Sequence, residues 1–247
     1  MRSITGRASV LSAYSARHRD EMKKEPMRLP AVTVFDVNET LSDLSGMSFR
    51  FAEIGAPREE AALWFATVLR DGFALAAAGG SERFATIAED LLRLRLRDQP
   101  LNTDIEPAVA HVLSGFAELS LHPDVVPGVS ALHAAGRRLV TLSNGSTSVA
   151  DRLFRTAGIR EMFDALLSVE DTSRWKPARE AYEYAANACG VGVGEMMLVA
   201  VHPWDIHGAD AAGLQTVWVN RSGGPYPPYF AAPLYEVRSL EELARLG

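Results

Sequence analysis

Apolar, strand-like runs alternate with helical patterns from residue 122 to the end of the chain, and this alternation limits the fold more than any other feature. The strand-like runs are 138–142, 165–168, 196–201 and 216–220, and the helical patterns are 129–135, 149–157, 178–189 and 206–212. Strands joined through helices are parallel neighbours in a sheet that is covered on both faces. The sequence therefore predicts an α/β fold with a doubly wound, Rossmann-like parallel sheet.

The run Val32-Thr33-Val34-Phe35 predicts the first strand of this sheet, and it ends at Asp36. Open α/β sheets bind their ligands at the carboxyl ends of the strands. An aspartate at that edge can be a metal ligand, a general base or a nucleophile, and the alternative is a helix N-cap. The residues that end the other strands decide between these roles.

Residues 47–121 have a different character, with no strand-like run. Apolar residues fall at helical spacing in 59–78 and 82–97, and Pro107 can open a third helix over 108–119. We therefore expect a helical cap domain, 47–121, inserted after the first strand of a core domain formed by 28–46 and 122–247. A lid over the active edge of the sheet is one interpretation of this cap, and a purely structural subdomain is the other.

The first 27 residues differ from the rest, because residues 1–19 carry four arginines and four serines without an acidic residue. Organellar transit peptides share this composition. We expect instead a disordered N-terminal extension, or an upstream start codon with Met22 or Met27 as the true beginning.

Composition excludes several classes of function. The net charge of -6 leaves no basic excess for a broad nucleic-acid-binding face. The single cysteine, Cys189, excludes an internal disulfide and a cysteine-based zinc cluster. No apolar run approaches the roughly 18 to 20 residues of a membrane span. We expect a soluble, cytoplasmic protein that does not act on nucleic acid or membranes.

Polar residues follow the predicted strands at four places, and a parallel sheet brings such strand ends together. In chain order they are Asp36, Ser143 with Asn144, Lys176, and His202 with Asp205. The segments Phe35-Asp36-x-x-x-Thr40-Leu41, Leu142-Ser143-Asn144-Gly145, Lys176-Pro177 and Trp204-Asp205 resemble the four motifs of the haloacid dehalogenase superfamily. The resemblance covers about residues 29–246, including the helical cap, and implies a carboxylate nucleophile.

The carboxylates that each branch of the superfamily requires indicate which branch this chain resembles. Its magnesium-dependent phosphatases need a second aspartate two residues after the nucleophile and a metal-binding carboxylate in the fourth motif, where this chain has Asn38 and Val201. The sequence instead resembles the type II 2-haloacid dehalogenases, with Tyr182 six residues after Lys176. The resemblance implies hydrolysis of short 2-haloacids to 2-hydroxy acids, without metal or organic cofactor. The partners are then the 2-haloacid and halide, and a homodimer fits the family.

The resemblance also implies a role for each side chain. Asp36 would attack the halogen-bearing carbon and form an ester, and Lys176 would keep it ionised. Asp205 would position Lys176 and Ser143 or take part in hydrolysis, and Thr40 would donate to Asp36 or to the ester, or only cap locally. The remaining predictions concern the substrate, which Asn38, Ser143, Asn144 and Tyr182 would bind. The alternative for Tyr182 is packing on a helix face.

Two departures from the family pattern change these expectations. Relatives commonly have asparagine and glycine where this chain has His202 and Glu39, so a Glu39–His202 hydrogen bond would make the imidazole the base for the ester-cleaving water. The alternative is that Glu39 faces solvent and His202 only replaces the asparagine as a hydrogen-bonding group.

The second departure is in the cap, where Phe65 follows Trp64 in place of a family arginine that receives the halide. Arg70 could substitute for it only after a rotation of the cap, since it lies about 140° further around the helix. Otherwise Trp64, Phe65 and Trp204 would form an apolar halide pocket. A phosphatase of the same superfamily and a non-catalytic binding protein are the alternative functions.

Overall fold

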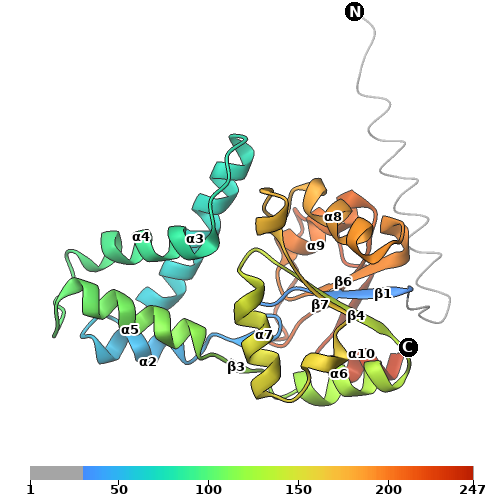
Figure 1. The fold of residues 1–247 in the computed structure, drawn as a ribbon, viewed down its shortest axis with the longest axis horizontal. Coiled ribbons are helices and arrows are strands. Elements are labelled where there is room, and N and C mark those ends of the chain that lie inside the picture. The colour runs from blue at the N-terminus through green and yellow to red at the C-terminus, as the bar shows by residue number, and fades with distance from the viewer. Residues whose placement is uncertain (1–29, 247) are drawn as a thin grey trace, which may run out of the picture.

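The computed structural model describes residues 30–246, so the expectation for residues 1–27 lies outside the described residues. Its main sheet has six parallel strands in the order β5-β4-β1-β6-β7-β8 (Figure 1). The strands are β1 (Val32–Phe35), β4 (Arg138–Ser143), β5 (Ala165–Ser168), β6 (Met196–Ala200), β7 (Gln215–Val219) and β8 (Tyr235–Val237). This order confirms the predicted doubly wound α/β fold.

Helices cover both faces of the sheet (Figure 1). One face packs against α6 (Val125–Ala134), α7 (Thr147–Thr156) and α10 (Leu240–Leu246), and the other against α8 (Arg179–Cys189) and α9 (Pro203–Ala212). Short 3₁₀ turns lie at Arg160–Met162, Val169–Asp171 and Val193–Glu195. Val34 and Phe35 of β1 are fully buried on opposite faces, as expected for a strand covered on both sides.

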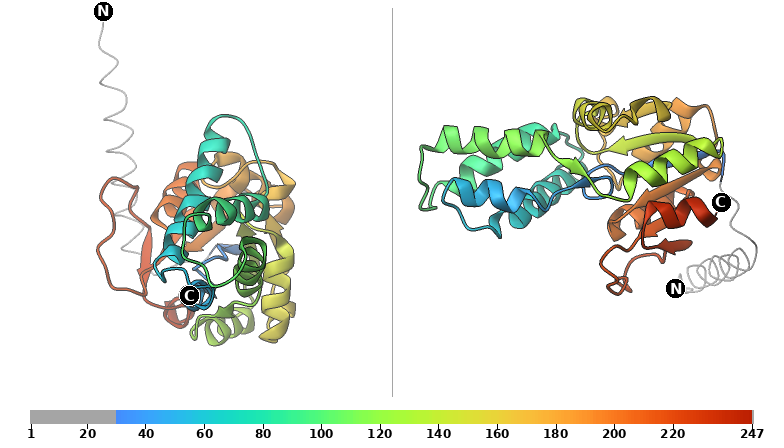
Figure 2. Two further views of the ribbon diagram at one scale, coloured as in Figure 1. Left: turned by 90° about the vertical axis from the view of Figure 1, so that its left-hand side faces the viewer. Right: turned by 90° about the horizontal axis from the view of Figure 1, so that it is seen from below.

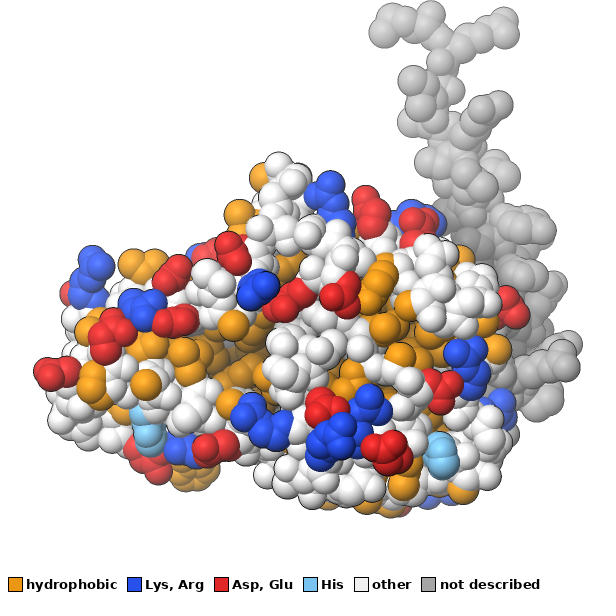
Figure 3. Space-filling model, in the orientation of Figure 1, with side chains coloured by type: hydrophobic (Ala, Val, Ile, Leu, Met, Phe, Trp, Pro, Cys, Tyr) orange, Lys and Arg blue, Asp and Glu red, His pale blue; other side chains and the backbone are white. Residues whose placement is uncertain are grey.

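A second, helical unit stands beside the sheet (Figures 1 and 2). It contains α2 (Met47–Glu53), α3 (Glu60–Ala77), α4 (Phe84–Leu96) and α5 (Ile105–Ala117). The chain enters and leaves this unit through β2 (Ser42–Asp43) and β3 (Ser120–Leu121), which pair antiparallel. In Figure 3, hydrophobic side chains gather in a hollow near the boundary between the two units.

Several elements differ from the sequence-based predictions. Helix α2 and strand β3 were not expected, because seven and two residues are too short to show a clear period. The strand at 215–219 is not the last one, since β8 follows with only Tyr-Glu-Val and no apolar run. Helix α9 begins at Pro203 rather than Ile206, which makes His202 its N-cap residue and places Asp205 in its first turn.

The strand register aligns the polar residues at one edge. Phe35 lies opposite Thr141 of β4 and Val199 of β6. β1 ends at this level, β6 continues to Ala200 and β4 to Ser143, so the three strands end within two residues of one another at the same edge. The chain order reverses on either side of β1 at this edge. Within residues 30–246, no helix is long and apolar enough to cross a membrane.

Candidate active site

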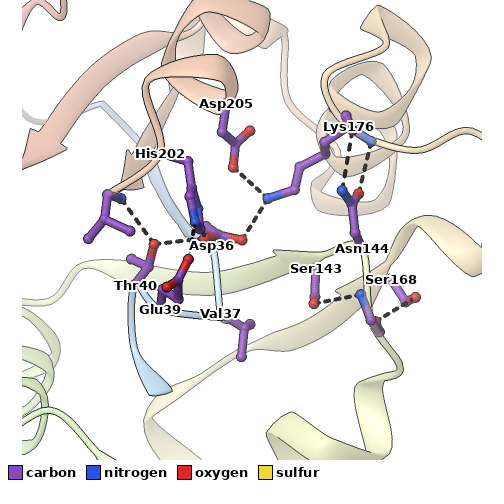
Figure 4. Close-up of polar contacts among 12 residues, drawn as sticks. Asp36, Val37, Glu39, Thr40, Ser143, Asn144, Ser168, Lys176, His202 and Asp205 are labelled. Atoms are coloured by element: carbon purple, nitrogen blue, oxygen red, sulfur yellow. Dashed lines mark hydrogen bonds and ion pairs between the residues drawn. The ribbon is translucent and has the colours of Figure 1, made fainter. Parts of the chain in front are cut away.

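Asp36 directly follows β1 and is only 4% exposed. Its Oδ1 accepts a hydrogen bond from Lys176 Nζ at 2.9 Å. Its Oδ2 accepts one from Thr40 Oγ1 at 2.7 Å and lies 3.1 Å from His202 Nδ1 (Figure 4). Lys176 and Thr40, which were predicted to contact the nucleophile, thus meet His202 on one carboxylate.

These neighbours keep Asp36 ionised. Burial alone would raise its pKa, but the charge of Lys176, followed by the contact with His202, outweighs burial and holds the pKa well below the usual 3.8. A carboxylate must be ionised to attack carbon, and these contacts keep it so. Asp36 therefore has the properties of an attacking group.

Lys176 is completely buried and joins two carboxylates. Its Nζ donates to Asp205 Oδ2 at 2.6 Å as well as to Asp36. Burial would lower the pKa of Lys176, but Asp205 and Asp36 raise it above 10.5, so the ammonium stays charged. The predicted contact between Asp205 and Lys176 is confirmed, whereas Ser143 instead accepts from the Gly145 N–H at 2.9 Å.

Tyr182 does not line the substrate end of the site as predicted. Its side chain is fully buried on α8, and its hydroxyl donates to Asp205 Oδ1 at 2.6 Å. Burial and the charge of Asp205 raise the pKa of Tyr182 well above 10, so it stays a donor. Helix α9 approaches closely because residue 208 is glycine; a Cβ there would lie 2.7 Å from the Tyr182 hydroxyl. Tyr182 positions Asp205.

Asn144 holds the backbone of Lys176. Its Oδ1 accepts from the Lys176 N–H at 2.9 Å, and its Nδ2 donates to the Lys176 carbonyl at 3.2 Å. The Asn144 oxygen and one of its N–H groups bind the loop, so only the second N–H is left for the substrate carboxylate, and substrate binding by Asn144 stays a prediction. The amide fixes the loop that carries the lysine.

Glu39 and His202 form the hydrogen bond expected from the sequence, with Nε2 2.8 Å from Glu39 Oε2. Glu39 has a φ of 61°, a left-handed conformation that costs a residue with a Cβ about 1–2 kcal/mol. The family glycine at this position has no such cost. The chain therefore tolerates backbone strain at the place where it puts a carboxylate on His202, which indicates a functional contact.

The structure also shows a contact that the sequence did not reveal, between His202 Nδ1 and Asp36. Both ring nitrogens face carboxylate oxygens, which only accept hydrogen bonds, so both must carry a proton. Burial opposes this charge, but the hydrogen bonds with Asp36 and Glu39 raise the pKa of His202 to about 9. In the resting state His202 is therefore an imidazolium, so the predicted role as base for the ester-cleaving water requires that it first lose a proton.

Ser143, Asn38 and Phe84 come close together around Gly145. A Cβ atom added to Gly145 would be 3.5 Å from Ser143 Oγ, 3.6 Å from Asn38 Nδ2 and 4.0 Å from Phe84 of the helical unit. Ser143 Oγ accepts from Gly145, so its O–H is left to donate to a ligand. Two hydrogen-bond donors and an aromatic ring thus face the Gly145 backbone.

A cleft of about 710 Å³ opens between the core and the helical unit. Glu39 and His202 line it from the core, and Phe65 lines it from α3. Trp64 also borders the cleft but is fully buried in the helical unit, where its indole donates to the Ala88 carbonyl at 2.9 Å. The prediction that Arg70 binds the substrate is wrong in this structure, because the Arg70 side chain is 70% exposed and pairs with Asp71.

Aromatic contacts between the two units escaped the sequence analysis. Trp204 stacks on His202 with ring centroids 5.0 Å apart and meets Phe73 of α3 at 4.8 Å, so it does not form a halide pocket with Trp64. Trp175, next to Lys176, is buried against α3, where a Cβ on Gly72 would lie 2.3 Å from its ring. In the sequence, only the position of Trp175 directly before Lys176 could have indicated this contact.

The fold and the site together define a class: an α/β hydrolase with a carboxylate nucleophile at the switch point of its sheet and a helical unit beside it. A model of the haloacid dehalogenase-like hydrolase family matches residues 31–213. The chain belongs to the haloacid dehalogenase-like hydrolase family.

Characterised relatives agree with this assignment. The chain is 32% identical to (S)-2-haloacid dehalogenase 4A of Burkholderia cepacia, over 85% of this chain and 91% of that protein. It is 31% identical to (S)-2-haloacid dehalogenase of Pseudomonas sp. strain YL, over 86% and 92%. The crystal structure of a dehalogenase with an intermediate complex superposes with a TM-score of 0.82 at 29% identity, covering 89% of this chain and 98% of that one.

Proposed function

We propose that this chain hydrolyses (S)-2-haloalkanoic acids to (R)-2-hydroxy acids and halide, without a metal or organic cofactor. The observation that carries this proposal is the buried Asp36 carboxylate, which Lys176 and His202 keep ionised at the switch point of the sheet. The names of the relatives support the substrate class and its handedness.

The reaction has two displacements. An oxygen of Asp36 attacks C2 of the substrate in line with the carbon–halogen bond, halide leaves with the bonding pair, and an ester forms. Water then adds to the carbonyl carbon of Asp36 and releases the 2-hydroxy acid. Only the first step takes place at C2, so the configuration inverts once and the (S) substrate becomes the (R) product.

We place the substrate carboxylate beside Gly145. The Ser143 hydroxyl and the Asn38 amide supply neutral donors there, which leaves the charge of Lys176 for the nucleophile. Phe65 and Phe84 pack together at 6.1 Å on the cap side, and their positive ring edges can contact the leaving halide in place of the family arginine.

The reaction needs only the 2-haloacid and water, and it releases halide and a proton. We place the protein in the cytoplasm, because its one cysteine, Cys189, is free, as is usual under reducing conditions. A homodimer stays a prediction, which sedimentation at several protein concentrations can test.

Halide release from (S)- and (R)-2-chloropropanoate, with and without EDTA, tests the function. We expect release from the (S) enantiomer, unchanged by EDTA, and a mass increase on the Asp36 peptide after incubation with chloroacetate. Phosphate release from an aryl phosphate that EDTA abolishes would identify a phosphatase instead. No halide and no adduct would identify a non-catalytic protein.

A further inference from the structure

The two oxygens of Asp36 have different partners (Figure 4). Oδ2 is bound by two groups, Thr40 Oγ1 at 2.7 Å and His202 Nδ1 at 3.1 Å. Oδ1 is bound by one of the described side chains, Lys176, at 2.9 Å. A carboxylate oxygen accepts about two hydrogen bonds, so Oδ2 is saturated and Oδ1 keeps a lone pair for attack.

We infer that Oδ1 of Asp36 is the attacking atom, and that Thr40 and His202 form an oxyanion hole at Oδ2 for hydrolysis of the ester. This inference rests on the proposed function. Once Oδ1 is alkylated, Oδ2 becomes the carbonyl oxygen of the ester, and its two donors are already in place. Negative charge develops on that oxygen when water adds to the carbonyl carbon.

Both donors are fixed before the reaction begins. Thr40 is fully buried, and its Oγ1 accepts from the Val201 N–H at 3.0 Å, so its hydroxyl proton is directed to Asp36. His202 is held by Glu39 on its other nitrogen and by Trp204 against its ring. Donors that need no reorganisation stabilise a developing oxyanion most effectively.

The assignment accounts for every bond and proton in hydrolysis. The water oxygen bonds to the Asp36 carbonyl carbon, and the carbonyl π pair moves onto Oδ2. When that pair returns, the bond from carbon to Oδ1 breaks, and Oδ1 departs as the oxygen of the product. Lys176, which already donates to Oδ1, protonates it and regains a proton from the attacking water. The second water proton leaves to solvent as Asp36 ionises again.

Two substitutions of His202 distinguish a role as hydrogen-bond donor from a role as base. Asparagine, the common family residue at this position, donates a hydrogen bond through its amide but cannot act as a base. Alanine does neither, and both variants lose the imidazolium charge equally. The difference between His202→Asn and His202→Ala therefore isolates the hydrogen bond to Oδ2.

Single-turnover experiments with (S)-2-chloropropanoate, quenched and followed by mass spectrometry of the Asp36 peptide, give the rate of ester hydrolysis. We expect His202→Asn to stay within about tenfold of the wild type and His202→Ala to lose about 10²–10³-fold. Equal losses in both variants would overturn the donor role. Thr40→Ser, which keeps the hydroxyl, is the matched control for Thr40→Val, with circular dichroism to verify folding.

Repeated turnover in oxygen-18 water tests the choice of Oδ1. If one oxygen always attacks and the other stays in the oxyanion hole, Asp36 gains one heavy oxygen and never two. In His202→Ala, where the carboxylate is less firmly held, the second label should accumulate. Two labels in the wild type would overturn the inference, whereas no label at all would show that the proposed function itself is wrong.

Discussion

His202 lies 3.1 Å from Oδ2 of Asp36, while Lys176 binds the other oxygen. The nucleophile is therefore flanked by two cations, and Asp205 balances the second charge at 2.6 Å from Lys176. Formal charges cancel within this group of four, which makes its burial tolerable. Glu39 adds one negative charge at the edge of the cleft.

Replacement of the nucleophile removes the covalent step. Asp36→Asn keeps the shape of the side chain but lacks a nucleophilic oxygen, so we expect halide release to fall by at least about 10³-fold. Mass spectrometry should detect no ester on residue 36. An Asp36→Asn protein with normal folding and near-normal turnover would rule out the covalent mechanism.

Removal of the buried ammonium destabilises the fold. Lys176→Met leaves the buried Asp205 without a cation and Asp36 with His202 alone, so we expect a loss of about 3–5 kcal/mol in the free energy of unfolding. The matched double variant, Lys176→Met with Asp205→Asn, should regain stability without activity. Urea unfolding measures both, and a loss below about 1 kcal/mol in the single variant would contradict the charge balance described above.

Glu39 sets the charge of His202 at the cost of backbone strain. Glu39→Gly relieves the strained φ but removes the partner of Nε2, and Glu39→Gln keeps a hydrogen-bond acceptor without the charge. We expect the pKa of His202, about 9 in the wild type, to fall in Glu39→Gln and to fall further in Glu39→Gly. NMR titration of the imidazole measures this order, and identical titration curves in the three proteins would refute it.

Stability should decrease at alkaline pH through His202. Its pKa rises from 6.5 to about 9 on folding, so its contribution is complete below pH 6.5 and is lost as pH rises through about 9. We expect the free energy of unfolding to drop by about 1–3 kcal/mol across this window. The matched His202→Asn variant should lose less; parallel pH curves for both proteins would exclude this coupling.

Contact between the cap and the lysine loop depends on a glycine. Gly72→Ala would place a Cβ 2.3 Å from the Trp175 ring, next to Lys176, so α3 and the loop must separate. We expect a loss of about 1–3 kcal/mol in stability and a lower kcat/KM. Gly194→Ala, which meets no atom within 4 Å, is the control. Equal thermal stability of the two variants would show that this contact is not tight.

The meeting of Asp36, Ser143 and His202 was predictable, because a parallel sheet places the carboxyl ends of its strands at one edge. Asp36, Ser143 and His202 each follow an apolar run, and registered parallel strands place such residues at one edge whatever their separation in sequence. Lys176 was predictable for a different reason, since its place in the chain matches a family motif. The Glu39–His202 hydrogen bond followed from two coordinated departures from the family pattern.

Side-chain direction was harder to predict, because it depends on packing between distant segments. Tyr182 points beneath the site because Gly208 lets α9 approach α8, and neither residue alone indicates this. Asn144 binds a backbone that lies 32 residues away. Trp64 turns into the helical unit, where Ala88 offers a carbonyl group. Such contacts leave no periodic pattern in the sequence.

Single turnover in oxygen-18 water, with enzyme in excess over (S)-2-chloropropanoate, tests the covalent role of Asp36 most directly. In the ester mechanism the product receives its new oxygen from Asp36, so the label should appear in the Asp36 peptide and the lactate formed should carry ordinary oxygen. Labelled lactate with an unlabelled Asp36 peptide would mean that water attacks the substrate itself, and would contradict the nucleophilic role of Asp36.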